Sequence, residues 1–512
     1  MTTILLAQGL KMAALVGGIS PIIAIDRKAQ APLYAQIYAA YRARILAGEL
    51  RAGQQIPSTR ELAAELGISR IPVLDAYGQL LAEGYFESRV GSGTFVSSSL
   101  PDQLDTRDDY KHKGRAAPPQ AQSGPRRVAA RAKAIPRYER PPWILHRNAF
   151  SLSQPALDAF PFRVWSNLVA RYARGLQVGG LYYGNPMGLD GLREAVAGYL
   201  RTARGVHCDT QQIMIVSGSQ QAIDLSARVL LDTGDAVWLE EPGYWLIQNT
   251  LRAAQCRMVP VPVDDEGLDV AAGIRLCRKT RAVYVAPSHE YPLGVTMSAS
   301  RRLQLLAWAQ SCGAWIIEDD YDSEYRYESM PVSSLQGLDR ASRVIYIGTF
   351  SKVLFPSLRL GYIVIPPDLV NRFTTVRNAT DICPSHLHQA VLADFIQEGH
   401  FARHLRRMRR LYGERRRALV ESIRAEIGDA LEIVGAEAGM HLCAIMRKDR
   451  GGSGRRDVEL AVKAAREKLS LWPLSPCYLG RRKREGFILG FGNTPAEEIP
   501  PAVRRLDALL RA

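Results

Sequence analysis

A lysine and an arginine lie close together in a setting that suits covalent cofactor chemistry. Lys352 follows the apolar run Val344–Ile347 and is flanked by Thr349 and Ser351, and Arg359 lies a short distance downstream. A lysine amine is nucleophilic near neutral pH when it is partly desolvated, and a phosphate needs hydroxyl donors and a guanidinium. The pattern predicts a Schiff base between Lys352 and pyridoxal 5′-phosphate (PLP). A surface lysine after a strand gives the same short pattern, so the rest of the chain must decide.

Two turns that follow apolar runs supply further groups for such a cofactor. The turn Ser217–Gln221 follows the run Ile213–Val216 and opens a helix, and its Gly218 lets the backbone approach an anion at the helix N-terminus. Tyr244 follows the run Val237–Leu239 and can stack on a planar ring. Taken alone, the first turn is more typical of an ordinary helix N-cap, and Tyr244 is more typical of a packing aromatic residue.

Acidic residues follow a third apolar run, Trp315–Ile317. Asp319 can keep a pyridine nitrogen protonated, which makes the ring an electron sink, and Tyr321 can hydrogen-bond the 3-oxygen of the ring. A metal site and a solvated acidic loop are the alternatives for this stretch.

The elements that must position these groups alternate between strand and helix patterns from about residue 150 onward. This alternation predicts an α/β domain with a mostly parallel sheet and helices on both faces. Ligands of such sheets bind at the carboxyl ends of the strands, where the candidate residues fall. The strand-like runs are Ile213–Val216, Val237–Leu239, Val283–Ala286, Trp315–Ile317, Val344–Ile347 and Tyr362–Ile365.

The N-terminal part of the chain has a different pattern. Ser58 and Glu61 form a capping box for a helix that runs to about Leu66, and a glycine turn leads to a second helix with Ser69 as its N-cap. Two short helices joined in this way predict a helix-turn-helix. Two short strands around a glycine-rich tip follow at 84–96 and predict a β-wing.

Composition and charge limit the possible functions. The chain has 512 residues, of which 47% are hydrophobic, and a formal net charge of +15, so more than one domain and an anionic partner are expected. The excess of basic residues is unevenly distributed along the chain: residues 98–145 carry ten Lys/Arg against five Asp/Glu, whereas residues 30–97 carry six of each. Seven scattered cysteines without a Cys-x-x-Cys pair indicate no disulfide framework and no zinc site, so no metal is expected and a reduced cytoplasm fits. No run is long enough to span a membrane.

The C-terminal pattern, over roughly residues 150–512, resembles the fold-type I aminotransferases. The order of phosphate cradle, stacking aromatic, Asp/Tyr pair and Lys/Arg pair carries the resemblance. It implies that Lys352 forms the aldimine, that Asp319 lies at the pyridine nitrogen and that Tyr321 lies at the 3-oxygen. It also implies a phosphate site made of Ser219, Gln220, Thr349 and Arg359, with Tyr244 stacked on the ring.

The N-terminal segment resembles the GntR-type winged helix, on the motifs Pro57–Ala63, Leu66–Arg70 and Gly91–Val96. Together the two modules are similar to the MocR (PdxR/GabR-type) regulators, and the stretches 288–294, 318–324 and 399–408 match that subfamily's own motifs. The candidate DNA contacts are Ser58, Arg60, Ser69 and Arg70 at the helix starts and Gly93 in the wing. The expected organisation is an N-terminal extension at 1–22, a winged helix at 23–97, a flexible basic linker at 98–145 and an aminotransferase-like effector and dimerisation domain at 146–512. The extension is expected to be disordered, with Met12 as a possible true start.

Three positions depart from the aminotransferase pattern. Tyr291 stands where aminotransferases have an asparagine, and Ile488 stands where an arginine grips the α-carboxylate of the substrate. Leu246 stands where some MocR proteins carry a second effector-binding arginine. The two absent arginines weaken the case for an amino-acid ligand and suit a protein whose effector is the cofactor itself.

The sequence therefore predicts a PLP-binding regulator of transcription that binds a double-stranded operator as a cytoplasmic homodimer and uses its aminotransferase-like domain for sensing rather than catalysis. PLP or a PLP adduct is the expected effector, and an amine or amino acid is the alternative. Two other functions stay open: a working aminotransferase with an appended DNA-binding domain, and a chromosome-associated structural protein with a vestigial PLP fold. Ile488 and Leu246 argue against the first, and the intact Lys352, Asp319 and Arg359 argue against the second.

Overall fold

The chain forms two compact units, Met1–Pro125 and Arg126–Ala512, which are described separately. The computed structural model describes residues 23–89, 91–98, 127–137, 139–144, 148–175, 182–327, 333–447, 455–480 and 483–511. The predicted extension at 1–22 and most of the predicted linker lie outside these residues. Within the described part of the linker segment, α4 (Ala130–Lys133) forms one helical turn.

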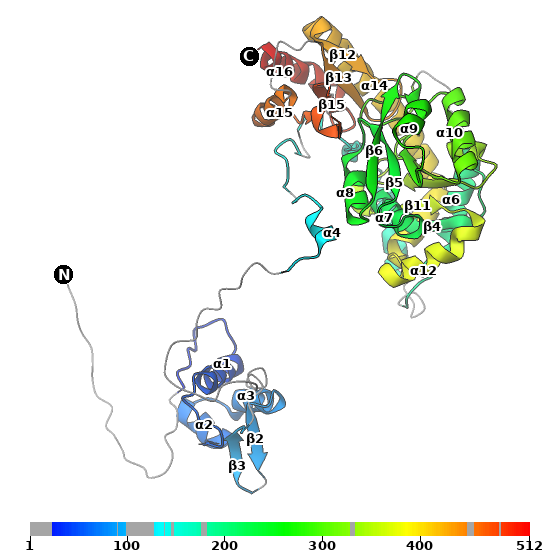
Figure 1. Cartoon of the computed structure of the whole chain (residues 1–512). Helices are drawn as coiled ribbons and strands as arrows, with labels where there is room; N and C mark the ends of the chain where they lie inside the picture. Colours follow the sequence, from blue (N-terminus) through cyan, green and yellow to red (C-terminus); the bar gives the residue numbers. More distant parts are fainter. Residues whose placement is uncertain are drawn as a thin grey trace. The chain divides into compact units, whose positions relative to one another are not determined.

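The N-terminal unit is a winged helix-turn-helix, as predicted (Figure 1). The turn between its second and third helices contains Gly67 at φ 61°, a left-handed conformation that glycine adopts without strain. Ser58 accepts a hydrogen bond from the backbone of Glu61, and the Glu61 carboxylate accepts one from the backbone of Ser58, which confirms the capping box. Its elements are α1 (Leu33–Leu46), β1 (Gln55–Ile56), α2 (Thr59–Leu66), α3 (Arg70–Ala82), β2 (Phe86–Arg89) and β3 (Gly93–Val96), with the strands in the antiparallel order β1-β3-β2.

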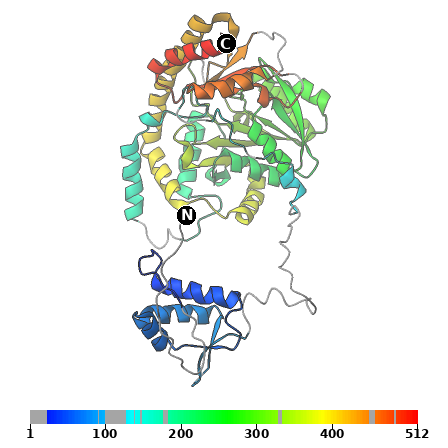
Figure 2. The ribbon, with the colours of Figure 1, turned by 90° about the vertical axis from the view of Figure 1, so that its left-hand side faces the viewer.

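A small aromatic cluster holds this unit together. The rings of Tyr41, Tyr77 and Phe86 meet edge to face, with centroids 5.2–5.7 Å apart. Both tyrosine hydroxyls are satisfied, because they bond each other at 3.1 Å and Tyr77 also donates to the carbonyl of Pro57 at 3.0 Å. The cluster thus joins α1, α3 and the wing, which appear in blue as one group in Figure 2.

The C-terminal unit is built on an eight-stranded sheet of order β4-β11-β10-β9-β8-β5-β6-β7. Strands β4, β5, β6, β8, β9 and β10 run in one direction, whereas β11 is antiparallel to both β10 and β4 and β7 is antiparallel to β6. The predicted α/β class and mostly parallel sheet are therefore confirmed. The strands are β4 (Ile213–Val216), β5 (Ala236–Glu241), β6 (Arg257–Asp264), β7 (Gly267–Leu268), β8 (Ala282–Val285), β9 (Trp315–Asp320), β10 (Val344–Thr349) and β11 (Gly361–Val364).

Helices cover the sheet, and a second sheet lies toward the C-terminus. The helices of this unit, besides α4, are α5 (Phe162–Arg174), α6 (Asp190–Ala203), α7 (Ser219–Leu230), α8 (Trp245–Ala253), α9 (Val270–Leu276), α10 (Ala299–Cys312), α11 (Leu335–Leu338), α12 (Val370–Thr380), α13 (His386–Gln397), α14 (His400–Ser422), α15 (Arg456–Arg466) and α16 (Ile499–Arg511). The second sheet is antiparallel in the order β12-β13-β15-β14, with β12 (Leu431–Val434), β13 (His441–Met446), β14 (Trp472–Pro473) and β15 (Gly486–Gly490). The sequence pattern did not predict this sheet.

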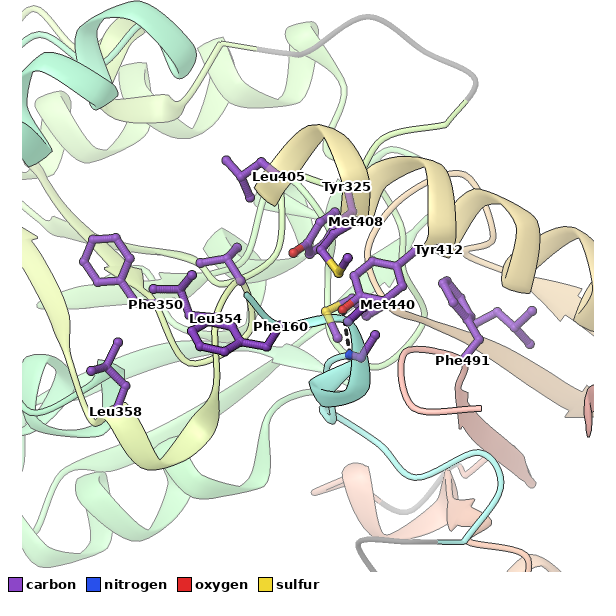
Figure 3. Packing of buried hydrophobic residues seen from close by; sticks show 14 of the residues in the cluster. Phe160, Tyr325, Phe350, Leu354, Leu358, Leu405, Met408, Tyr412, Met440 and Phe491 are labelled. Carbon is purple, nitrogen blue, oxygen red and sulfur yellow. Dashed lines mark hydrogen bonds between the residues drawn. The ribbon is translucent and has the colours of Figure 1, made fainter. Parts of the chain in front are cut away.

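The long helix α14 joins the two sheets through one hydrophobic core. Its buried residues Leu405, Met408 and Tyr412 pack with Phe160, and with Met440 beside the second sheet (Figure 3). The Tyr412 hydroxyl accepts a hydrogen bond from the backbone of Ala156 at 2.9 Å. The arginine-rich segment 401–417 lies on this helix. No helix among the described residues is both long enough and apolar enough to cross a membrane.

Candidate functional site

All eight predicted cofactor residues line one cavity of about 300 Å³ in the C-terminal unit. They come from segments between residues 219 and 359 and meet at the edge of the sheet where the parallel strands end. The eight are Ser219, Gln220, Tyr244, Asp319, Tyr321, Thr349, Lys352 and Arg359.

Strand register explains why the distant segments meet. Asp319 pairs with Ile347 across β9 and β10, so the turn that carries Lys352 starts close to the acidic end of β9. Because β11 is antiparallel to β10, Arg359, which precedes β11, returns to the same edge of the sheet. Arg359 itself has φ 52°, in the left-handed region.

The start of α7 forms an anion cradle with Arg359. Gly218 has φ +91°, and a Cβ atom placed on it would lie 3.2 Å from the Arg359 guanidinium. Arg359 donates a hydrogen bond to the carbonyl of Ser217 at 2.6 Å, which holds the guanidinium beside the start of α7. Ser219 is the first residue of this helix, so the predicted phosphate groups lie together at a positive helix end.

Asp319 is held by a tyrosine that the sequence analysis missed. The Tyr284 hydroxyl, on β8, donates to Asp319 Oδ2 at 2.5 Å, while Asp319 Oδ1 is buried without a hydrogen-bond partner among the described residues. Burial raises the pKa of Asp319 to about 6, and the Tyr284 hydrogen bond opposes that rise. The carboxylate therefore presents one unpaired oxygen, as binding to a protonated ring nitrogen requires.

Lys352 is partly buried and lies near two acids, Asp322 and Asp319. Burial lowers the pKa of its amine to about 8, although the carboxylates of Asp322 and Asp319 act in the opposite direction. A fraction of the amine is thus neutral near pH 7, which is the nucleophilic form.

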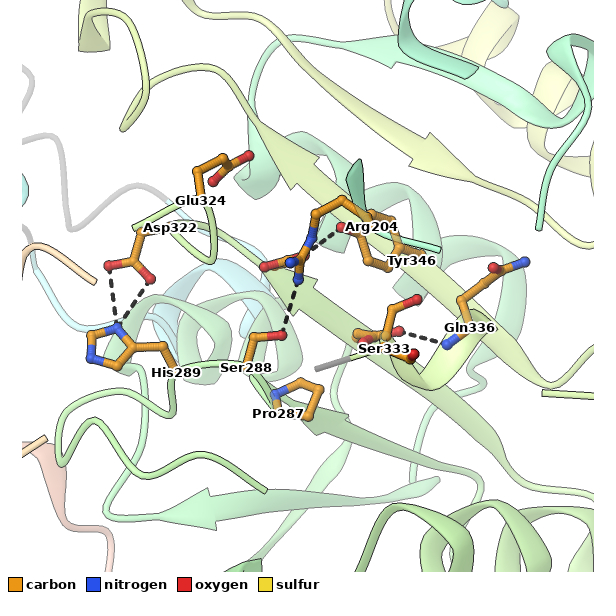
Figure 4. Close-up of polar contacts among 12 residues, drawn as sticks. Arg204, Pro287, Ser288, His289, Asp322, Glu324, Ser333, Gln336 and Tyr346 are labelled. Carbon is orange, nitrogen blue, oxygen red and sulfur yellow. Dashed lines mark hydrogen bonds and ion pairs between the residues drawn. The ribbon is translucent and has the colours of Figure 1, made fainter. Parts of the chain in front are cut away.

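Tyr321 lines the cavity, but its hydroxyl is engaged elsewhere than the sequence analysis predicted. It donates to the carbonyl oxygen of His289 at 2.7 Å and lies 3.2 Å from His289 Nδ1. His289 Nδ1 is in turn 3.0 Å from Asp322 Oδ1 (Figure 4). His441 lies next to this pair, and the possible ligand atoms of His289, Asp322 and His441 are within 4.8 Å of one another. A bond from Tyr321 to a ring oxygen requires the hydroxyl to turn away from His289.

The remaining acids of the β9 end face away from the cavity into a buried polar layer. Asp320 accepts hydrogen bonds from Arg204 at 2.7 Å and from the hydroxyl of Tyr346 (Figure 4). Burial alone would raise the pKa of Asp320, but the Arg204 guanidinium holds that pKa below its usual range. Glu318 accepts hydrogen bonds from the backbone of Leu335 and Gln336 at 2.8 and 2.9 Å. The stretch is thus buried and partnered, which argues against the alternative of a solvated acidic loop.

The three departures from the aminotransferase pattern lie in the lining of the cavity or directly behind it. Leu246 and Tyr291 line the cavity. Ile488 is fully buried on β15 and packs with Tyr291 and Cys477, and it pairs with Trp472, another lining residue. Trp472 was not predicted, because it comes from the unforeseen second sheet.

The residues present fit PLP. Asp319 Oδ1, Gln220 Oε1 and Ser351 Oγ are buried polar atoms without partners among the described residues, and each lies in a residue that lines the cavity. Buried polar atoms without partners are rare in folded proteins, and a ligand that supplies the partners removes their cost. A side chain at Gly218 would crowd the Arg359 guanidinium, because its Cβ would lie 3.2 Å away.

In the N-terminal unit, four of the predicted DNA contacts cluster at the starts of α2 and α3. Ser58 and Ser69 are the N-cap residues, although Ser69 makes no side-chain cap bond, and Arg60 is exposed in the first turn of α2. Arg70 opens α3 and donates to Thr59 Oγ1 at 2.9 Å, which ties the two helix starts together. Gly93 lies apart from them at the wing, with φ +104°.

Two family models match the chain. Residues 33–96 match the model for bacterial regulatory proteins of the gntR family, and residues 152–506 match the model for class I and II aminotransferases. The matches cover the two units described above.

Full-length relatives carry the same pair of modules. The chain is 42% identical over 493 residues to the probable rhizopine catabolism regulatory protein MocR of Rhizobium meliloti, covering 96% of each chain. It is 28% identical to the pyridoxine biosynthesis transcriptional regulator PdxR of Corynebacterium glutamicum, covering 92% of this chain and 94% of the relative. Among solved structures, the kynurenine aminotransferase of Pyrococcus horikoshii, a complex with PMP, matches with a TM-score of 0.66 and 28% identity over 72% of this chain and 91% of that one.

Proposed function

We propose a function from the premise that this chain belongs to the MocR-type transcriptional regulators of the GntR family, in which a winged helix-turn-helix is combined with an aminotransferase-like domain. The GntR domain implies DNA binding, and the aminotransferase fold implies PLP binding. The finer proposal is that the winged helix binds an operator and that PLP, or an adduct of PLP, bound in the cavity changes the affinity for that operator.

One observation supports this proposal above the others: eight residues predicted from the sequence to hold PLP line a single cavity. In our proposal Ser219, Gln220, Thr349 and Arg359 hold the phosphate, Tyr244 stacks on the ring, and Tyr321 turns toward the ring oxygen. Asp319 keeps the ring nitrogen protonated, and Lys352 is the covalent attachment point. When bound, PLP supplies an electrophilic imine carbon that reacts with amines.

On the DNA side, Arg60 and Arg70 stand at helix starts, where arginine side chains reach base edges or phosphates in helix-turn-helix complexes. We assign Ser58, Ser69 and Gly93 to contacts with the sugar-phosphate backbone of the same DNA site. A pair of winged helices suits an operator with two half-sites, so the proposal includes a homodimer. A regulator of chromosomal genes acts in the cytoplasm, which is the location we propose.

Sensing requires that PLP bind the DNA-competent and DNA-incompetent states unequally. We propose that the segment 98–145, which connects the two units, transmits this difference by setting the spacing of the paired winged helices. We do not assign catalysis to the chain, because no arginine occupies position 246 or 488.

The test is an operator-binding titration. The DNA is the region upstream of the chain's own gene, the readout is fluorescence anisotropy, and the protein is compared with and without PLP. PLP is expected to change the dissociation constant severalfold in wild type and to have no effect on Lys352→Ala protein. An unchanged affinity in wild type, together with a clear response to an amino acid, would contradict PLP sensing. A monomeric mass in sedimentation at micromolar concentration would contradict the homodimer.

A further inference from the structure

We infer that the cavity takes, beside the cofactor, a small primary amine that carries no carboxylate. The inference deepens the proposed function and rests on it, because it concerns the second ligand of the same cavity. It follows from the charges, the wall and the size of that cavity.

Among the described residues of one subunit, the charges of the lining leave nothing to pair with a carboxylate. Among the described residues that line the cavity, the side chains that can carry a positive charge are Lys352 and Arg359. Arg359 is held against Gly218 and the carbonyl of Ser217, at the phosphate end. Lys352 is the attachment point of the cofactor. Asp319 is assigned to the ring nitrogen, and Glu240 adds a further carboxylic acid to the same lining, so a ligand carboxylate would meet an acid rather than a free guanidinium.

The apolar and aromatic part of the lining, called the wall here, consists of Leu152, Trp245, Leu246, Tyr291 and Trp472. Ile488 packs behind Tyr291 with no exposed surface, so the position predicted for a carboxylate-binding arginine is filled by a hydrocarbon side chain. A carboxylate placed against this wall would lose its water without gaining a charged partner, whereas an uncharged body loses little.

The size of the cavity restricts the ligand further. Its volume of about 300 Å³ has to hold both the cofactor and the ligand. Ligand pockets commonly reach about 300–1,000 Å³, so this one is at the small end. The body of the amine is therefore small as well as uncharged.

A primary amine can replace the amine of Lys352 on the cofactor without a further reactant. PLP, when bound, would supply the imine carbon for this exchange, and Lys352 Nζ would leave that carbon as the free amine and take up the two protons that the ligand amine gives up. Neither water nor an oxidant is consumed in this exchange.

The experiment uses full-length protein loaded with PLP and matched ligand pairs that differ only in the carboxylate: ethanolamine with serine, isobutylamine with valine, and 2-phenylethylamine with phenylalanine. The readouts are the visible absorption spectrum and the affinity for the upstream DNA. In at least one pair, the amine is expected to reach half-saturation at a concentration at least about tenfold below that of its amino acid. Equal or tighter binding of the amino acids in every pair, or no response to either set, would overturn the inference.

Two variants distinguish an effect of the missing cation in the cavity from a general effect of adding an arginine. Leu246→Arg places a guanidinium on the wall at a partly exposed position. It is expected to reduce the difference in half-saturation concentration between the amine and its amino acid, which is called the gap below. Leu303→Arg makes the same change at a residue of α10 that is 59% exposed and does not line the cavity, and it should keep the wild-type gap. If the gap in Leu246→Arg protein is as wide as in wild type, the lack of a free cation in the lining is not the reason that amino acids bind more weakly. Protein that takes up no PLP shows no visible band at all, and that result contradicts the proposed function rather than the choice of ligand.

Discussion

The hydroxyl of Tyr284 donates a hydrogen bond to one carboxylate oxygen of Asp319, a residue that lines the cavity, and the other oxygen has no partner among the described residues. This bond fixes the carboxylate and favours its ionised form. Two neighbouring strands, β8 and β9, thereby supply a positioned acid at the place where the ring nitrogen of PLP is proposed to lie.

Tyr284→Phe is expected to weaken PLP binding roughly 10- to 100-fold, because a hydrogen bond to a charged group is lost and the carboxylate is less well positioned. Equilibrium titration of cofactor-free protein with PLP measures the change. Tyr325→Phe is the matched control, since its buried hydroxyl has no partner among the described residues and does not line the cavity. Equal losses in both variants would contradict a specific role for Tyr284.

Lys352→Ala is expected to abolish the visible absorption band of protein-bound PLP, because no amine remains to form the imine. Lys463→Ala, on an exposed position of α15, should retain the band. Spectra of both purified proteins after incubation with PLP and desalting make the comparison. A band of wild-type intensity in Lys352→Ala protein would show that another residue carries the cofactor.

The rate of PLP attachment is expected to rise with pH and to reach half its plateau near pH 8. The pKa of Lys352 is lowered to about 8, so raising the pH through that value converts the ammonium to the free amine that attacks the aldehyde. An exposed lysine, with a pKa of about 10.4, reacts in the same way only at higher pH. Stopped-flow absorbance between pH 6 and 10, with N-acetyl-lysine as the reference amine, measures the two midpoints. Coincident midpoints would contradict burial of the Lys352 amine.

Arg60→Ala and Arg70→Ala are each expected to weaken operator binding by about 1–3 kcal/mol, as for an arginine that contacts a base. Arg51→Ala removes an exposed arginine outside α2 and α3 and serves as the control. The Arg70→Ala change also removes the hydrogen bond to Thr59 that ties the starts of α2 and α3 together. Fluorescence anisotropy at fixed salt concentration provides the measurement, and wild-type affinity in both helix variants would contradict the assignment.

Local patterns in the sequence were enough to predict much of the fold and the candidate site. The apolar run Ile213–Val216 is β4 residue for residue, and the capping box at Ser58 starts α2 as predicted. Such features depend on neighbouring residues alone. Because parallel strands present their carboxyl ends at one edge, residues that follow several strands could be expected to meet before their order in the sheet was known.

Features that depend on distant contacts were missed. Tyr284 lies inside an apolar run, where its hydroxyl gives no signal of the bond to Asp319. Trp472 reaches the cavity through a two-residue strand that no periodicity marks. The hydroxyl of Tyr321 was predicted at the cofactor, but a carbonyl oxygen of His289 competes for it, and that neighbour becomes visible only when the loops are packed.

The position of β4 in the sheet has a consequence for the nascent chain during translation. β4 is an edge strand whose one partner, β11, is also the last strand of this sheet in the sequence, and the cradle at Gly218 is completed by Arg359, just before β11. A ribosome adds about 5–20 residues per second, so β11 is synthesised roughly 7–30 s after β4. During that time the nascent chain has an unpaired edge and an incomplete phosphate site. Capture of the cofactor must therefore follow translation of the sheet rather than guide it.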